Sequence, residues 1–348
     1  MTIKPGALRF NTDSMKLEIF RGSANYEGSA SMAGIGTLAA GQWEEIVATS
    51  PEAQTGGALG LVAGGYGGHQ TDIDKLTIST TGNAVDYGDL SSPRYGIHGA
   101  SDRTRGVFAG GRNDPTPAAP STTIDFVSFG SGGTAATFGS LSTPSASGTR
   151  GNIGNSTRGL FACLDNSAID YITIQSTGNS QDFGDLTINT ATGGRGAACS
   201  QTRGILFGGG PSNADVIEFV TTSTLGNSSD FGDLTQAFVN NSGVSNAVRS
   251  VIACGTGPTQ PAGIGSGILE FITMSTLGNS QDFGDQQAFR SRGCVASSTR
   301  GVFAGGADPG TNIIDYVELM SKGDSVDFGD LTNPAETPGS CSNGHGGL

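Results

Sequence analysis

Short apolar runs alternate with turn-forming residues along most of the chain, and the segment 157–201 gives the clearest example. Residues 158–163 form an apolar run that predicts a buried strand, and residues 168–175 alternate between apolar and polar positions, which predicts a second strand. The sequence STGNS that follows is typical of a turn. Residues 182–187 predict a third strand with one aromatic residue to bury, and residues 194–200, which are rich in small residues, predict a fourth.

This unit occurs six times, so the chain is a repeat protein. The phrase TRGVFAGG stands at 104–111 and again, unchanged, at 299–306, and weaker copies open the other units. A second phrase, DFGDL or a variant of it, follows each copy, and its aromatic residue recurs every 45 to 52 residues. These aromatic residues are Tyr87, Phe138, Phe183, Phe231, Phe283 and Phe328. Four short strands in a repeat of this length are typical of a β-propeller blade.

The pattern therefore predicts an all-β fold, a six-bladed β-propeller over residues 58–348. Strands rich in Gly, Ala, Cys and Ser suit the crowded positions near the axis, and the aromatic of DFGDL suits the outer positions. The first unit starts at Ala58 without a small-residue strand before it, whereas small residues at about 339–345 follow the last unit. We therefore expect the C-terminal strand to complete the first blade and to close the ring.

The order of strands resembles the kelch repeat, in which a small strand, an apolar strand ending in Gly-Gly, an alternating strand with an acidic-aromatic pair and an aromatic strand follow one another. The acidic-aromatic pairs are Asp125-Phe126, Asp170-Tyr171, Glu218-Phe219, Glu270-Phe271 and Asp315-Tyr316. Kelch units usually carry Trp in the last strand, where this chain has Phe or Tyr, and the Gly-Gly is lost in the third and fifth units. The resemblance is therefore to a divergent kelch-like propeller. TRGVFAGG with DFGDL also resembles repeats in structural proteins of tailed bacteriophages.

Residues 1–57 lie outside the repeats. Two alternating segments around a polar turn predict a β-hairpin, and a Gly-, Ala- and Ser-rich insert separates it from a third strand that holds the only Trp. A sheet of this size is too small to be stable alone. The hairpin sequence GALRFNTDSMKLE resembles one found in phage tail and fibre proteins, which implies that this segment docks the propeller onto a virion; a plain cap on the propeller is the alternative. The docking residues would be Leu8, Phe10, Leu17, Ile19 and Trp43.

Composition narrows the possible partners. Glycine accounts for 58 of 348 residues and charged residues for 14%, which favours short strands and tight turns over a helical bundle. A net charge of −13 argues against nucleic acid, which needs clustered Lys and Arg. No apolar stretch approaches the roughly 18 residues of a membrane helix, and no secretory signal is visible. The five cysteines form no CxxC motif and are expected to be small buried hydrophobes.

Motifs that would carry chemistry are missing from the sequence. It has no G-x-S-x-G, P-loop or HExxH motif, and the Asp boxes and arginine cluster of six-bladed sialidases are absent. Of the three histidines, His69 lies in a glycine-rich loop, whereas His98 and His345 fall at related places in the small-residue strands. Those two could line the channel together but lack a third metal ligand. We predict no enzymatic activity, no cofactor and no metal.

One arginine opens the apolar strand of five units, and one aspartate closes the FGD phrase of five units. We predict that they join neighbouring blades through Arg–Asp pairs or shared hydrogen bonds, and capping of its own turn is the alternative role for each aspartate. The exceptions, Leu59 for the arginine and Ser140 for the aspartate, would fall on one pair if each arginine met the aspartate of the next blade. The residues are Arg105, Arg158, Arg203, Arg249 and Arg300, with Asp89, Asp185, Asp233, Asp285 and Asp330.

The loops at 112–121 and 256–266 lengthen the same connection in two units, and such insertions often mark a binding face. Together with the phage resemblance, this predicts a non-enzymatic virion structural protein in a tail fibre, baseplate or decoration position, assembled in the host cytoplasm. It would contact other virion proteins through the N-terminal segment, occur in several copies per particle, and present loops to a host surface glycan or protein. A glycan-binding or glycan-processing propeller is the alternative.

Overall fold

The computed structural model describes residues 7–11, 16–21, 42–45, 58–67, 71–113, 119–146, 148–162, 167–188, 194–210, 214–261, 264–307 and 310–348. The chain divides into two compact units, Met1–Gln54 and Thr55–Leu348. In the first unit, β1 (Leu8–Asn11), β2 (Lys16–Arg21) and β3 (Gln42–Glu45) form an antiparallel sheet in the order β1-β2-β3.

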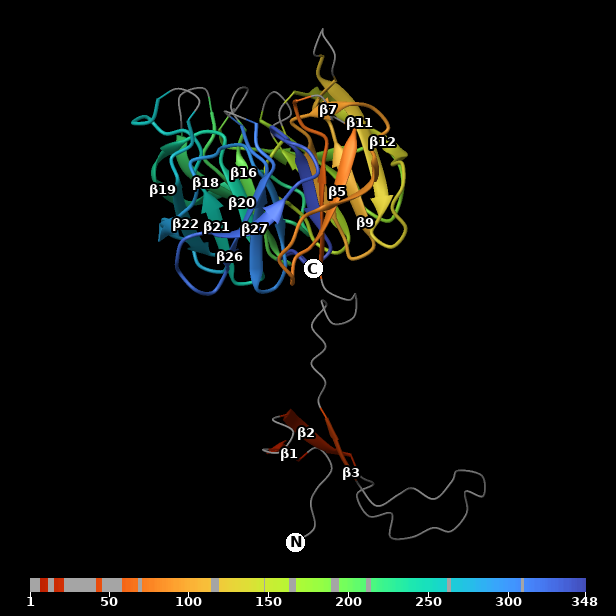
Figure 1. Cartoon of the computed structure of the whole chain (residues 1–348), viewed down its shortest axis with the longest axis vertical. Coiled ribbons are helices and arrows are strands. Elements are labelled where there is room, and N and C mark those ends of the chain that lie inside the picture. Colours follow the sequence, from red (N-terminus) through yellow and green to blue (C-terminus); the bar gives the residue numbers. More distant parts are fainter. Residues whose placement is uncertain are drawn as a thin grey trace. The chain divides into compact units, whose positions relative to one another are not determined.

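The second unit is a six-bladed β-propeller (Figure 1). Blade 1 contains β28 (Gly339–Ser342), β4 (Leu59–Ala63), β5 (Asp72–Thr77) and β6 (Val85–Asp89). Blade 2 contains β8 (His98–Ser101), β9 (Arg105–Ala109), β11 (Ser121–Ser128) and β12 (Ala136–Ser145), and blade 3 contains β13 (Arg158–Ala162), β14 (Ala168–Thr173) and β15 (Gln181–Asp185). Within the described residues, strands and turns account for the fold and no helix occurs.

Blade 4 contains β16 (Gly196–Cys199), β17 (Arg203–Phe207), β18 (Ala214–Thr221) and β19 (Ser229–Phe238). Blade 5 contains β20 (Ser242–Ser245), β21 (Arg249–Ala253), β22 (Ile268–Thr273) and β23 (Gln281–Asp285). Blade 6 contains β24 (Gly293–Ala296), β25 (Arg300–Ala304), β26 (Ile313–Glu318) and β27 (Val326–Asp330). The short strands β7 (Arg94–Tyr95) and β10 (Arg112–Asn113) pair with each other beside blade 2.

The C-terminal strand closes the ring. β28 pairs antiparallel with β4, and Cys341 lies opposite Leu61 in this register. Blade 1 is therefore built from both ends of the propeller sequence, and the prediction of closure by the C-terminal strand is confirmed. The two ends of the propeller sequence are thus joined by main-chain hydrogen bonds within one sheet.

The division of the repeat into blades differs from the sequence unit by one strand. The unit 157–201 was expected to contain the small-residue strand at 194–200 as its fourth strand, and this is wrong. That strand, β16, pairs with β17 of the following unit, with Cys199 opposite Gly204. The reason is geometric: the short turn at 200–202 joins β16 to β17 as an antiparallel hairpin.

In the five blades with four strands, the innermost strand is buried along its whole length. Small residues let these strands approach one another closely, and a Cβ atom on Gly99 of β8 would overlap the carbonyl of Ser340 in β28. The apolar clusters lie between blades: one combines Phe231 of blade 4 with Ile272 of blade 5. The aromatic of DFGDL lies on the outermost strand, where Phe283 meets Phe271 edge to face at 6.1 Å.

Across the residues for which the structure gives positions, we find no helix of the length and apolarity needed to cross a membrane.

Candidate functional site

The outer edge of each blade is covered by a turn of the next blade. Between blades 3 and 4, the backbone N–H of Ser228 donates to the carbonyl of Asp185 at 2.8 Å, and the N–H of Asp185 donates to Asn227 Oδ1 at 3.0 Å. The N–H of Gly226 adds a bond to the carbonyl of Phe183 at 2.9 Å. The DFGD phrase and the GNS turn are thus two halves of one contact, and it satisfies an edge that would otherwise be open to other chains.

We call each of the six interfaces between adjacent blades a seam, and two glycines meet at every seam. At Gly184, which has a φ of 147°, a Cβ atom would lie only 2.5 Å from the backbone of Gly226. No side chain fits there, because the neighbouring group is backbone and cannot rotate away. The six pairs are Gly88–Gly133, Gly139–Gly178, Gly184–Gly226, Gly232–Gly278, Gly284–Gly323 and Gly329–Gly82.

The recurrent arginines also lie at the seams. Arg203 of blade 4 donates from Nη1 to the carbonyl of Met274 in blade 5 at 3.0 Å, and its guanidinium lies 4.8 Å from the ring centre of Phe219. The corresponding acceptors in the next blade are Ile174 O for Arg105, Ser223 O for Arg158, Leu319 O for Arg249 and Ser79 O for Arg300. Among the described residues these arginines bond to backbone carbonyls of the next blade, and no ion pair joins them to the recurrent aspartates.

The recurrent aspartates contribute mainly through their backbone. As in Asp185, the backbone N–H groups of Asp233 and Asp330 donate to an Asn Oδ1 of the next blade, and their carbonyls accept from a backbone N–H of that blade. The carbonyl of Asp89 accepts from Ala135 of blade 2 at 2.7 Å, and that of Asp285 accepts from Ser325 of blade 6 at 2.8 Å. Apart from the half-buried Asp330, these residues are exposed.

The two exceptions in the repeat do not meet each other. Leu59, which replaces the arginine in blade 1, packs against the apolar cluster that includes Phe129 of blade 2. Ser140, which replaces the aspartate in blade 2, donates from its backbone N–H to Asn179 Oδ1 of blade 3 at 3.1 Å. The coincidence in the sequence therefore does not reflect a pairing.

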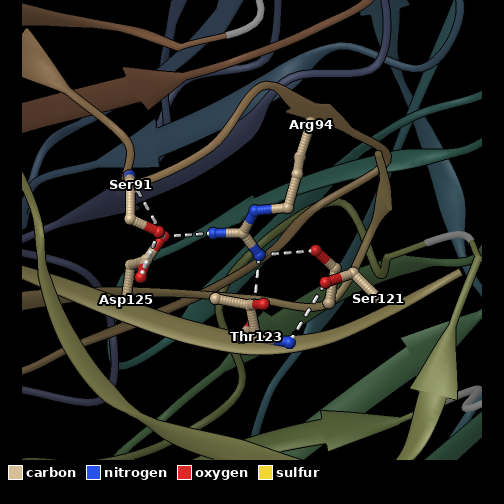
Figure 2. Close-up of polar contacts among 6 residues, drawn as sticks. Ser91, Arg94, Ser121, Thr123 and Asp125 are labelled. Carbon is tan, nitrogen blue, oxygen red and sulfur yellow. Dashed lines mark hydrogen bonds and ion pairs between the residues drawn. The ribbon is translucent and has the colours of Figure 1, made fainter. Parts of the chain in front are cut away.

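A buried carboxylate in the third strand of each blade forms a second polar contact between blades. Asp125 is fully buried, and Ser91 of blade 1 donates to it from Oγ at 2.7 and 2.8 Å (Figure 2). Equivalent hydroxyl groups donate to Asp170, Glu218, Glu270 and Asp74 from Ser142, Thr187, Thr235 and Thr332 of the preceding blades. Burial raises the pKa of Asp74, and its bonds to Thr332 oppose this.

Three buried arginines reinforce these carboxylates. Arg292 donates to Asp315 at 2.7 Å and to the carbonyls of Gly305 and Phe303, each at 2.9 Å. Arg292 and Arg195 stand directly before the innermost strands β24 and β16, whereas Arg94 lies in β7. Its guanidinium nevertheless pairs with Asp125 at 2.5 Å (Figure 2). Burial lowers the pKa of both guanidinium groups, and the paired carboxylate opposes the shift in each case. Arg195 pairs with Glu218 in the same way at 3.2 Å.

This carboxylate network can hold blades together, but its groups are enclosed. Arg94 and Asp125 expose none of their side chains, so a substrate could reach them only after the seam opened. The donor hydroxyls were not among the predicted site residues, although the sequence holds a signal for them. Ser or Thr follows the DFGDL phrase in five of six units, and in the fifth unit, which precedes the blade of Asp315, Gln287 takes this place.

Both described histidines are buried near the axis. His98 lies between Ser145 Oγ at 3.0 Å and Thr149 Oγ1 at 3.2 Å, and burial lowers its pKa to about 3. His345 contacts Cys199 Sγ at 3.2 Å and the carbonyl of Ser101 at 3.1 Å, and burial lowers its pKa to about 4. In the part of the chain with assigned positions, no three His, Cys, Asp or Glu side chains are arranged to hold a metal ion.

The described cysteines, Cys199, Cys254, Cys294 and Cys341, are buried and free, and burial raises the pKa of each thiol. His69, Cys163 and parts of the long loops lie outside the described residues. In the N-terminal sheet, Leu8 pairs with Ile19, Phe10 with Leu17, and Trp43 with Phe20.

Comparisons of the sequence with models of known protein families and with curated proteins gave no match.

Proposed function

We propose that the protein is a non-enzymatic structural component of a tailed-bacteriophage virion, a divergent kelch-like propeller in a tail fibre, baseplate or decoration position. The observation that carries this is the use of the recurrent residues. The recurrent arginines and glycines lie in seam contacts, and the aspartates contribute backbone bonds to them, so the repeats serve cohesion of the ring. A module of this kind suits permanent assembly, in which the part must persist without a cofactor or a moving lid.

The N-terminal sheet is the proposed docking element. Its hairpin resembles those of phage tail and fibre proteins, and three strands of this length gain stability by packing on another surface. The exposed Leu8, at 60% of its full accessible surface, is a side chain that a partner could cover.

Mass spectrometry of particles purified from the source of this sequence tests the proposal. We expect the chain at a fixed copy number relative to the major capsid protein, and its loss from particles made with residues 1–54 deleted. Absence of the chain from infectious particles would contradict the proposal, whatever the propeller binds in isolation.

One observation favours glycan binding as a second candidate. Tyr66 follows Gly64 and Gly65 in the loop after β4, is 52% exposed, and meets Tyr95 edge to face at 5.4 Å. Exposed aromatic faces are common contacts for sugar rings. Titration with host polysaccharide separates binding from cleavage: a shift in tyrosine fluorescence lost in Tyr66→Ala would support binding, and released reducing ends would support processing.

A further inference from the structure

Residues 343–348 follow β28, and Asn343, His345, Gly346 and Gly347 among them are buried. This segment forms no strand, so its burial depends on contacts with the rest of the propeller.

Those contacts reach every blade. The Asn343 Oδ1 atom accepts from the N–H of Leu59 in blade 1 at 2.8 Å, and Gly346 donates to the carbonyl of Ser245 in blade 5 at 3.0 Å. His345 reaches blades 2 and 4 through Ser101 and Cys199. Gly347 and Gly344 complete the set: a Cβ atom on Gly347 would overlap the carbonyl of Gly154 in blade 3, and one on Gly344 would lie 3.4 Å from the carbonyl of Ala296 in blade 6.

The imidazole of His345 has a defined protonation pattern. Nδ1 faces two donors, the N–H of Gly347 at 3.1 Å and the thiol of Cys199 at 3.2 Å, so it accepts. Nε2 faces the carbonyl of Ser101 at 3.1 Å, so it carries the proton. A second proton on Nδ1 would face both donors and would remove both bonds. Two titratable groups of the described residues act on this ring. The Asp102 carboxylate next to β8 favours the charged ring, and the Cys199 thiol of β16 is kept neutral by burial, which raises its pKa.

We propose that residues 343–348 form a latch that ties the six blades together at the axis, and that protonation of His345 releases it. Release moves residues 343–348 away from the axis, and β28 stays paired with β4. The inference does not depend on the proposed virion role. It concerns how the ring is held shut and under which conditions its axis opens.

Cys199 reports the state of the latch, because it is fully buried and contacts His345 directly. The probe is 4,4′-dithiodipyridine, a disulfide that exchanges with thiols in acid: the Cys199 sulfur forms a mixed disulfide, and thiopyridone leaves with the thiol proton. Cys254, buried in the seam between blades 4 and 5, is the internal control for global unfolding. Peptide mapping by mass spectrometry assigns the labelled residue.

We expect labelling of Cys199 in the full chain to be about 70-fold faster at pH 4.5 than at pH 7.5, after correction with the same reaction of an unfolded peptide. This factor follows from a pKa of about 4 in the closed latch against 6.5 in the open tail. Cys254 should stay protected at both pH values. H345Q cannot titrate, so its Cys199 labelling should be independent of pH whether or not the latch still holds.

A truncation that removes residues 343–348 gives the second arm, with rapid labelling of Cys199 expected at pH 7.5. Three results would overturn the proposal: equal labelling of Cys199 at the two pH values in the full chain, a joint rise of Cys199 and Cys254, or an H345Q variant that keeps the full pH dependence. If the truncated chain does not fold, the comparison of the full chain with H345Q still decides.

Discussion

Replacing Gly184 by alanine should destabilise the propeller more than the same replacement of Gly226, its partner across the seam between blades 3 and 4. The two positions have nearly equal φ angles, 147° and 151°, in the range that side chains disfavour. Both variants therefore carry a similar backbone strain of roughly 1–3 kcal/mol. They differ in space: a Cβ on Gly184 would lie 2.5 Å from the backbone of Gly226, whereas a Cβ on Gly226 has no atom within 4 Å.

The difference between the variants isolates the seam contact. Forcing an extra carbon into a packed site costs about 1–3 kcal/mol, so we expect Gly184→Ala to be less stable than Gly226→Ala by that amount. For a unit of this size, that corresponds to roughly 2–5 °C in Tm. Equilibrium unfolding in urea and thermal unfolding, both followed by circular dichroism, measure the difference.

The next seam supplies a replicate. Gly232 and Gly278 have the same relation, with a Cβ on Gly232 again 2.5 Å from the neighbouring backbone and a Cβ on Gly278 free. The order of stabilities should be the same there. If Gly226→Ala or Gly278→Ala proves as destabilising as its partner variant, the glycines are required by backbone conformation alone and the seam argument is wrong.

Arg292→Met should lower the free energy of unfolding in urea by about 3–5 kcal/mol, because the buried Asp315 carboxylate is left without its partner. Adding Asp315→Asn to the same chain should restore part of this free energy, and additive effects of the two substitutions would argue against the pair. Thr235→Val should cost about 1–3 kcal/mol, because the buried Glu270 loses a hydroxyl donor, and a cost near zero would mean that the seam re-forms without it. The neutral His98 has a pKa lowered to about 3, so its contribution is full above pH 6.5 and declines by about 1.4 kcal/mol per pH unit as the pH falls toward 3. His98→Gln should flatten the acid limb of the curve of Tm against pH, and an unchanged limb would contradict this.

The number of blades and the closure of the ring could be predicted from the repeat alone. The regular recurrence of DFGDL fixes six units, and the unmatched small-residue strand at the C-terminus indicates which unit it completes. Periodicity did not show where a blade begins, because a strand sequence does not say which neighbour it pairs with. For β16, the short turn at 200–202 determines that the strand pairs with β17, which follows it.

The partners of the recurrent charges could not be read from the sequence. Arginine and aspartate recur in parallel, which suggests that they pair, but Arg203 bonds to a main-chain carbonyl, and every residue has one. A backbone acceptor leaves no trace in composition or spacing. The same holds for the contact of Gly184 with Gly226, in which both partners are backbone.

The exceptions in the repeat indicate that each seam requires a hydrogen-bond donor near the buried carboxylate, and that this donor can come from different positions of the repeat. Arg94 starts from β7, yet it reaches the carbonyls of Gly110 and Thr123 as Arg292 reaches those of Gly305 and Ile313. Asp315 lacks the hydroxyl donor of the other blades, and an arginine satisfies it. Different residues therefore meet the same need of a buried carboxylate. A search for further chains of this kind should score the predicted seam contacts, because matching of sequence letters would miss such replacements.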